Sequence, residues 1–354
     1  MRTPRSRSIS GENFLDIIIY FGRRNADTES MADFDFERIL IVNTFGIGDV
    51  LFTTPVAANI KQHLPDSQLG YVTNVRTAEL LNHHPLVDDV FVYERDDFSE
   101  LYKRSRVEFL REAQAFLDKI RAQQYDAVLD LSMNMPTGLL MKMAGIPRRI
   151  GFDYKGRGRF LTHRIPLKGY EGKHVVEHYL DLLATLGVPV QTRAMIFPIV
   201  SDDQQWAGDI RQRYQLDHCV IVMVPGGGAS WGGDASRKQW PIEKFADLAD
   251  RLVSRYGAKI VLVGGPKDKP LTQKMLVLMK GSAVDLTGDL TLGQSAALFA
   301  QSQLVIANDG GPLHMAVAVG ARTVSIFGPV DPAVYGPYPP VGHRVVHSNI
   351  ACRP

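Results

Sequence analysis

The sequence predicts an α/β protein made of two Rossmann-like domains whose parallel sheets face a central cleft. The chain has 354 residues, enough for two domains. Short apolar runs alternate with segments of helical periodicity, a pattern typical of parallel sheets built from right-handed crossovers. The alternation breaks near Phe197–Trp206 and starts again at Cys219. We therefore expect domains at 37–197 and 198–354, preceded by an N-terminal extension at 1–36.

The first block begins with Arg38–Asn43 (RILIVN), a continuous apolar run typical of a strand buried on both faces. Helical spacing follows over Thr54–His63. The block continues with predicted strands at Leu69–Thr73, Asp89–Tyr93, Ala127–Leu131 and Arg149–Phe152, and with predicted helices at Glu108–Arg121 and His174–Leu186.

The second block repeats the pattern. Cys219–Val224 is a predicted strand that enters a glycine-rich turn, and Pro241 opens a helix that runs to about Arg255. The block continues with predicted strands at Lys259–Val263, Leu304–Ala307 and Thr323–Phe327, and with predicted helices at Leu292–Gln301 and Pro312–Val319.

Charge and cysteine content narrow the class of protein. The chain has 40 basic and 38 acidic side chains, a net charge of +2, which argues against nucleic acid as a partner. Its two cysteines, Cys219 and Cys352, exclude a disulfide scaffold and a cysteine-based zinc cluster. This usage fits a reducing compartment.

The N-terminal extension has three open interpretations. Arg2, Arg5 and Arg7 precede a short apolar run at Phe14–Phe21, without the uninterrupted core and cleavage site of a signal peptide. The segment is either an amphipathic helix on a membrane surface or a tail that packs on the domain. In the third interpretation the natural start is Met31, just before the first strand pattern.

The strongest local signal is the turn at 308–316, NDGGPLHMA, between a predicted strand and a predicted helix. Gly310 and Gly311 leave backbone N–H groups uncovered at the helix start, an arrangement that suits a phosphate. We expect Asp309 to cap the helix and His314, one turn in, to reach a phosphate or a sugar. The alternative is an ordinary glycine-rich turn followed by a core histidine.

The turn Thr44–Asp49, TFGIGD, follows the first predicted strand. It lacks the third glycine of a dinucleotide fingerprint and the Lys-Ser/Thr pair of a P-loop. It offers the carboxylate of Asp49 at the carboxyl end of a strand, the edge where open α/β sheets bind ligands. The alternative is that Asp49 is only the N-cap of the next helix.

The loop from Pro225 to Pro241 combines glycines with polar side chains. Gly226–Gly228 permit close approach of the backbone to a ligand, and Ser230 adds a hydroxyl. Lys238 is the cation best placed to meet a phosphate before the next helix. The alternative interpretation is that Lys238 is solvated in a flexible loop.

A second basic loop contains Lys155, Arg157 and Arg159. Such a loop is either solvated or a clamp for an anionic substrate, and Arg76 is a similar, weaker candidate.

Together these segments resemble glycosyltransferase family 9, the ADP-heptose:lipopolysaccharide heptosyltransferases. The resemblance covers about residues 37–340, and its specificity comes from five segments in the family's order. These are RILIVNTFGIGDVLFTTP (38–55), HVVEHYLDLLATLGV (174–188), SRKQWP (236–241), VLVGGPKD (261–268), and NDGGPLHMAVAVG with SIFGPVDP (308–320 and 325–332).

The resemblance implies a GT-B fold, with an acceptor domain first and a nucleotide-sugar domain second, and inverting transfer without a metal or other cofactor. By position, Asp49 matches the family's proposed general base, Lys238 its phosphate-contacting lysine, and Leu290 an apolar residue near the nucleobase. The donor motif Asp-Ser/Thr-Gly-x-x-His is matched by Asp309, Gly310, Gly311 and His314. Gly310 departs from it, because it removes a hydroxyl near the pyrophosphate.

The resemblance therefore implies transfer of a heptose or related sugar from a nucleotide-sugar, with ADP-heptose as the favoured donor. The implied acceptor is an anionic glycolipid or saccharide such as the lipopolysaccharide core. It implies a cytoplasmic enzyme. The extension lies outside the resemblance, and peripheral contact at the cytoplasmic face of the inner membrane is one role for it. Two alternatives stay open: a transferase that uses another nucleotide-sugar, and a non-catalytic relative that binds a nucleotide or glycan.

Overall fold

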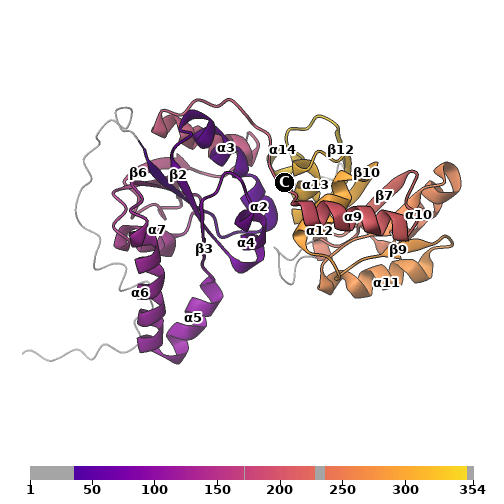
Figure 1. Cartoon of the computed structure of the whole chain (residues 1–354), viewed down its shortest axis with the longest axis horizontal. Helices are drawn as coiled ribbons and strands as arrows, with labels where there is room; N and C mark the ends of the chain where they lie inside the picture. Colours follow the sequence, from indigo (N-terminus) through magenta and orange to yellow (C-terminus); the bar gives the residue numbers. More distant parts are fainter. Residues whose placement is uncertain (1–35, 171, 228–235, 349–354) are drawn as a thin grey trace, which may run out of the picture.

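The computed structural model describes residues 36–170, 172–227 and 236–348, and it contains two parallel six-stranded sheets (Figure 1). The first sheet has the order β3-β2-β1-β4-β5-β6, and the second has the order β12-β11-β10-β7-β8-β9. Numbered within its own half, each sheet has the strand order of a Rossmann-like domain. The predicted fold class is confirmed. The N-terminal extension lies outside the described residues.

We call the elements around the first sheet the first domain. Its strands are β1 (Arg38–Val42), β2 (Gln68–Thr73), β3 (Asp89–Val92), β4 (Ala127–Asp130), β5 (Arg148–Tyr154) and β6 (His163–Leu167). Its helices are α2 (Ile47–Leu51), α3 (Thr54–His63), α4 (Val75–Asn82), α5 (Arg95–Arg104), α6 (Arg106–Ala122), α7 (Met135–Met143), α8 (Val175–Asp181) and the 3-10 helix η2 (Leu182–Leu186).

The elements around the second sheet form the second domain. Its strands are β7 (Val220–Val224), β8 (Lys259–Leu262), β9 (Ala283–Asp285), β10 (Leu304–Asn308), β11 (Thr323–Phe327) and β12 (His343–His347). Its helices are α9 (Ser201–Arg213), α10 (Ile242–Tyr256), the 3-10 helix η4 (Pro266–Asp268), α11 (Lys269–Leu278), α12 (Leu292–Ala300), α13 (Gly311–Ala318) and α14 (Pro332–Tyr335).

The central strand β1 shows why a continuous apolar run becomes a strand here. Ile39 and Ile41 pack into one hydrophobic cluster, whereas Leu40 and Val42 pack into another on the opposite face of the sheet. All four side chains are fully buried. Because successive side chains of a strand point to opposite faces, only an unbroken apolar run fills both layers.

The predicted strands agree with the structure to within two residues at each end, and two helix predictions need correction. The helix predicted at Glu108–Arg121 starts at Arg106, because the Ser105 side chain caps it by accepting the Glu108 N–H. The helix predicted at His174–Leu186 is α8 followed by the 3-10 helix η2, which ends at Gly187 with a φ of 68°. The junction predicted near 197–206 spans the start of α9.

Side chains of the first domain hold the second domain in place. Glu79 on α4 accepts the backbone N–H groups of Leu292 and Gly293 at the start of α12, at 2.9 and 3.4 Å. His174 Nδ1 accepts the Val176 N–H, so Nε2 carries the proton and donates to the Gly336 carbonyl at 3.0 Å. Figure 1 shows α2 and α4 on the side of the first domain that faces α12, α13 and α14.

Across the described ranges, none of the helices combines the length and the apolar character that crossing a membrane requires.

Candidate active site

A pocket of about 260 Å³ lies between the two domains, where α2 and α13 begin. Predicted site residues from both domains meet in it. Among the residues that the structure describes, those that line it are Gly48, Asp49, Phe52, Lys238, Asp309, Gly310, Gly311, His314, Val330 and Tyr335. The structure thus brings together six of the residues that the sequence singled out, although about 190 to 265 positions separate the Asp49 turn from the others.

Two glycines allow the helix starts to approach one another. A Cβ added at Gly48 would lie 2.7 Å from His314 Cδ2, and one added at Gly311 would lie 3.0 Å from Ile47 Cβ. Both distances are shorter than ordinary Cβ contacts, so a larger residue at either position would require the His314 or Ile47 side chain to shift.

Asp49 occupies the third position of α2. The interpretation that Asp49 is the N-cap of this helix is therefore wrong. The N-cap is Gly46, whose backbone N–H donates to Asp49 Oδ2 at 3.1 Å. The carboxylate therefore stabilises the start of the helix from within the first turn. It also lines the pocket, so a structural and a chemical role are compatible.

Burial is the main cause that raises the pKa of Asp49, to about 6. The Gly46 N–H and the positive charge of Lys238 lower it, and the negative charge of Asp309 raises it. A carboxyl with this pKa is ionised at neutral pH and is more basic than an ordinary aspartate. Such a group is suited to accept a proton from a substrate.

Lys238 and Asp309 form a buried ion pair at 2.7 Å, with side-chain exposures of 9% and 5%. The alternative of a solvated lysine is therefore wrong. The expected helix cap by Asp309 is also wrong, because the N-cap of α13 is Gly310, which has no side chain to cap the helix. The physical reason is the ion pair: the Lys238 ammonium lies against the Asp309 carboxylate and opposes the rise of its pKa on burial.

The start of α13 offers backbone groups to the pocket. Among the residues that the structure describes, nothing accepts the N–H groups of Gly310 and Gly311. Pro312 stands in the first turn, where its missing N–H leaves no gap in the helix. The positive end of the helix dipole and these N–H groups together favour an anion.

His314 is 3% exposed, and its ring meets the edge of Phe52 at a centroid distance of 4.5 Å. Burial, followed by the nearby His174 and Lys238, lowers its pKa to about 3. The imidazole is therefore neutral at neutral pH and acts toward a ligand through hydrogen bonding, not charge. Within the described ranges its Nδ1 has no hydrogen-bond partner.

The candidate residues Leu290 and Arg76 do not line this pocket. Leu290 is half-buried against the hydrophobic core just before α12. Arg76 is exposed on α4. Ser230 lies outside the described residues.

The basic loop follows β5 at the carboxyl edge of the first sheet. Lys155 and Arg157 are exposed and lie over the Tyr154 ring, at 4.9 and 5.8 Å from its centroid. Arg159 is half-buried, and its carbonyl accepts a hydrogen bond from Arg164. None of these side chains lines the pocket.

Of the other four lining residues, Gly48 lies in the turn that the sequence singled out, and sequence reasoning missed Phe52, Val330 and Tyr335. Phe52 and Val330 fall inside segments that carry the family resemblance, but neither has polar chemistry to single it out. Tyr335 belongs to the short helix α14, which the sequence did not predict. Burial raises the Tyr335 pKa to about 12, so its hydroxyl stays protonated and able to donate.

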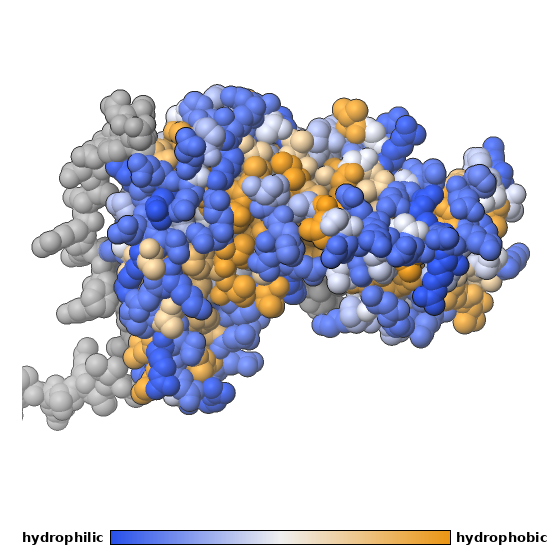
Figure 2. All heavy atoms as spheres, in the orientation of Figure 1, coloured by the Kyte–Doolittle hydropathy of each residue, from blue (hydrophilic) through white to orange (hydrophobic). Residues whose placement is uncertain are grey.

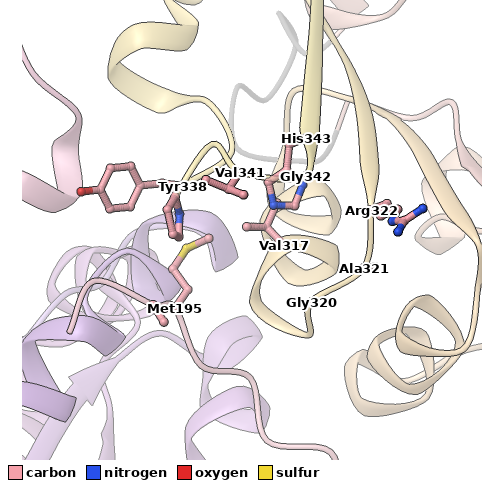
Figure 3. A pocket seen from close by; sticks show the side chains of 11 residues that line it. Met195, Val317, Gly320, Ala321, Arg322, Tyr338, Val341, Gly342 and His343 are labelled. Carbon is pink, nitrogen blue, oxygen red and sulfur yellow. The ribbon is translucent and has the colours of Figure 1, made fainter.

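A second pocket, of about 220 Å³, lies at the opposite end of α13 (Figure 3). It is lined by the linker residue Met195, by Val317 near the helix end, and by the segment around Tyr338 and Val341. Figure 3 shows Arg322 pointing away from the other lining side chains. A helix C-terminus presents carbonyl oxygens and disfavours anions, so this pocket is less suited to a diphosphate.

In the part of the chain that the structure describes, no three His, Cys, Asp or Glu side chains are grouped so as to hold a metal ion.

Two Rossmann-like domains with a pocket between them are the arrangement of a GT-B fold, and the fold alone does not establish the activity. The sequence profile of glycosyltransferase family 9 (heptosyltransferase) matches residues 113–354, more than half of the chain. The chain belongs to glycosyltransferase family 9.

Relatives and solved structures agree with this family. The chain is 27% identical over 307 residues to lipopolysaccharide heptosyltransferase 3 of Escherichia coli, covering 82% of this chain and 83% of that protein. A family 9 glycosyl transferase from Veillonella parvula superposes with a TM-score of 0.77 at 26% identity, covering 90% of this chain and 89% of that one. An Escherichia coli heptosyltransferase solved with ADP has the same fold, with a TM-score of 0.71 at 21% identity, covering 88% of this chain and 93% of that one.

Proposed function

We propose that this enzyme transfers a heptose from ADP-heptose to a saccharide of the lipopolysaccharide core, with inversion at the anomeric carbon. The observation that carries the proposal is the pocket in which Asp49 of the first domain meets the start of α13 and Lys238 of the second. It pairs a basic carboxylate with a group of cationic and N–H donors. A sugar transfer needs both, one for the attacking hydroxyl and one for the leaving diphosphate.

In the proposed donor site, the diphosphate lies at the start of α13. The N–H groups of Gly310 and Gly311 and the ammonium of Lys238 stabilise the charge that develops as ADP leaves. Asp309 holds Lys238 in place through the 2.7 Å ion pair. Neutral His314 contributes a hydrogen bond to the sugar or to a phosphate oxygen.

The reaction balances without a further reagent. The acceptor oxygen forms a bond to the anomeric carbon while the bond from that carbon to the diphosphate oxygen breaks. The bonding electrons leave with ADP, and the acceptor proton passes to Asp49. Inversion requires attack on the face of the anomeric carbon opposite the leaving diphosphate, so the proposal places the acceptor beside Asp49 and the diphosphate at the start of α13.

We further propose that no metal ion takes part, because Lys238 and the helix start already supply the positive charge that a metal would bring. The choice of ADP and heptose rests on the named relatives, one of which was solved with ADP. Another nucleotide-sugar is the alternative.

The test combines binding and turnover. Calorimetry with ADP, UDP and GDP should give the tightest binding for ADP, and ADP-heptose with a core acceptor should give a product heavier by one heptose. Tighter binding of UDP or GDP would favour the alternative donor. Nucleotide binding without any transfer would favour the non-catalytic alternative.

A further inference from the structure

The α5–α6 hairpin extends beyond the sheet of the first domain. No side chain of α5 is fully buried, although Phe98 packs against the core, and the buried residues of α6 are Phe116, Leu117 and Ile120, all in its second half. At about 1.5 Å per residue α6 is about 25 Å long, whereas the strand that follows it spans about 13 Å. Figure 1 shows the hairpin projecting from the domain, next to β3.

The direction of this projection follows from the chain path. The helix α6 leads into the start of β4, so its own start lies toward the carboxyl ends of the strands. The helix α5 begins three residues after β3 ends, at that same edge. Asp49 follows β1 at this edge too. The tip of the hairpin, residues 103–111, therefore projects past the edge of the sheet that carries the proposed acceptor site.

Two large apolar side chains are exposed at the tip. Val107 is 69% and Leu110 is 64% exposed, and they lie three residues apart on α6, on neighbouring positions of its surface. Hydrophobic residues of this kind are common on protein surfaces when they are isolated, so their exposure alone decides nothing. Figure 2 shows hydrophobic residues in orange among the blue surface of this projecting part.

The surroundings of the two side chains are cationic. Residues 103–111 carry four basic side chains and one acidic one, so their net charge is 4 − 1 = +3, compared with +2 for the whole chain. The acidic residue, Glu108, forms an exposed ion pair with Arg104 at 2.7 Å. The remaining basic side chains, Lys103, Arg106 and Arg111, are exposed around the apolar pair.

We propose that the tip of this hairpin docks on an anionic lipid bilayer, with Val107 and Leu110 entering the interface and the surrounding cations meeting the headgroups. Apolar area together with cations is the combination that binds anionic interfaces. The consequence for catalysis rests on the proposed function: a membrane-anchored acceptor is then presented to the edge of the sheet that carries Asp49.

The test measures flotation of the full-length chain with vesicles of phosphatidylcholine, with or without phosphatidylglycerol. The variant Val107→Asp/Leu110→Asp should bind anionic vesicles at least about tenfold less, because each residue loses its apolar contribution. The matched control is Val277→Asp/Leu278→Asp on α11 of the second domain, where the same two residue types are 85% and 42% exposed. The control should bind as the wild type does.

A second variant tests the charge. Lys103→Gln/Arg106→Gln/Arg111→Gln should weaken binding by roughly fivefold per residue, and high salt should do the same. The proposal is overturned if the wild type does not bind vesicles, if it binds neutral and anionic vesicles equally, or if the control loses as much as the hairpin variant. Unchanged binding by both hairpin variants would assign docking to another segment. If Val107→Asp/Leu110→Asp instead abolishes self-association, the tip contacts a second copy of the chain.

Activity separates this proposal from the proposed function. With a water-soluble acceptor analogue, the variant Val107→Asp/Leu110→Asp should retain wild-type transfer, whereas transfer to an acceptor embedded in vesicles should fall with binding. Vesicle binding itself requires no substrate, so it stands or fails independently of whether the enzyme uses ADP-heptose.

Discussion

Replacing Asp49 by asparagine separates the chemical role of this residue from its structural one. The Asn side chain has nearly the same shape, and its carbonyl oxygen can accept the Gly46 N–H that Asp49 Oδ2 accepts at 3.1 Å. What the substitution removes is the basic carboxylate. We therefore expect a folded protein with normal ADP affinity and with little transfer activity.

The magnitudes follow from the surroundings of the carboxylate. A general base contributes about 10²–10⁴-fold to a rate, or about 3–5 kcal/mol of transition-state stabilisation. The rise of the Asp49 pKa from 3.8 to about 6 means that burying its charge destabilises the fold by up to about 3 kcal/mol above pH 6. The Asn variant loses this penalty, so its free energy of unfolding at pH 7.5 should stay equal or increase.

The assay is transfer measured from pH 5 to 8, alongside ADP calorimetry and urea unfolding. In the wild type, kcat/KM should rise about tenfold per pH unit up to about pH 6 and then level off, because Asp49 must be ionised to accept a proton. The Asn variant should be slower by about 10²–10⁴-fold and should lose this acidic limb. An Asn variant with near wild-type activity and an unchanged pH profile would refute the role of Asp49 as the base.

Lys238→Ala should weaken ADP binding much more than adenosine binding in calorimetry, and equal losses would remove Lys238 from phosphate contact. Gly48→Ala should lower transfer by about tenfold to a hundredfold, because its Cβ would lie 2.7 Å from His314 Cδ2, whereas Gly208→Ala, whose Cβ meets no atom within 4 Å, should not; equal rates for both would contradict the close packing. Burial raises the pKa of Asp130 to about 6, so its folded state holds a proton that the unfolded state loses, and its contribution to stability falls as pH rises through 6. Between pH 5 and 7.5 the free energy of unfolding in urea should therefore fall by about 1 kcal/mol less for Asp130→Asn than for the wild type. An equal fall for both proteins would argue against the raised pKa of Asp130. EDTA should leave the rate of the wild-type enzyme unchanged, and a loss that magnesium restores would contradict the metal-independent proposal.

The fold was predictable because the apolar runs of the central strands β1 and β7 indicate burial on both faces without reference to the rest of the chain. A run such as Ile39–Val42 is apolar at every position, which is only compatible with burial on both faces. Elements at the margins give weaker signals: α5 has no fully buried residue and packs on the core through Phe98, and β12 is mostly exposed, so neither has a continuous apolar pattern to recognise. Their positions depend on packing against the rest of the chain.

The site was predictable to the extent that residue type alone indicates chemistry. Glycines at a helix start and an aspartate after a strand pointed to Gly310, Gly311 and Asp49. The partnership of Lys238 with Asp309 was not predictable, because 71 positions separate the two residues and each has a plausible local role. The domains must be assembled before burial forces the two charges to pair.

The most direct test of the central claim is a crystal structure of the full-length chain with ADP. We expect the diphosphate at the start of α13, with phosphate oxygens on the N–H groups of Gly310 and Gly311 and on Lys238, and with Asp49 facing it from α2. A diphosphate bound away from the start of α13, for example in the second pocket beside Met195 and Tyr338, would contradict the account.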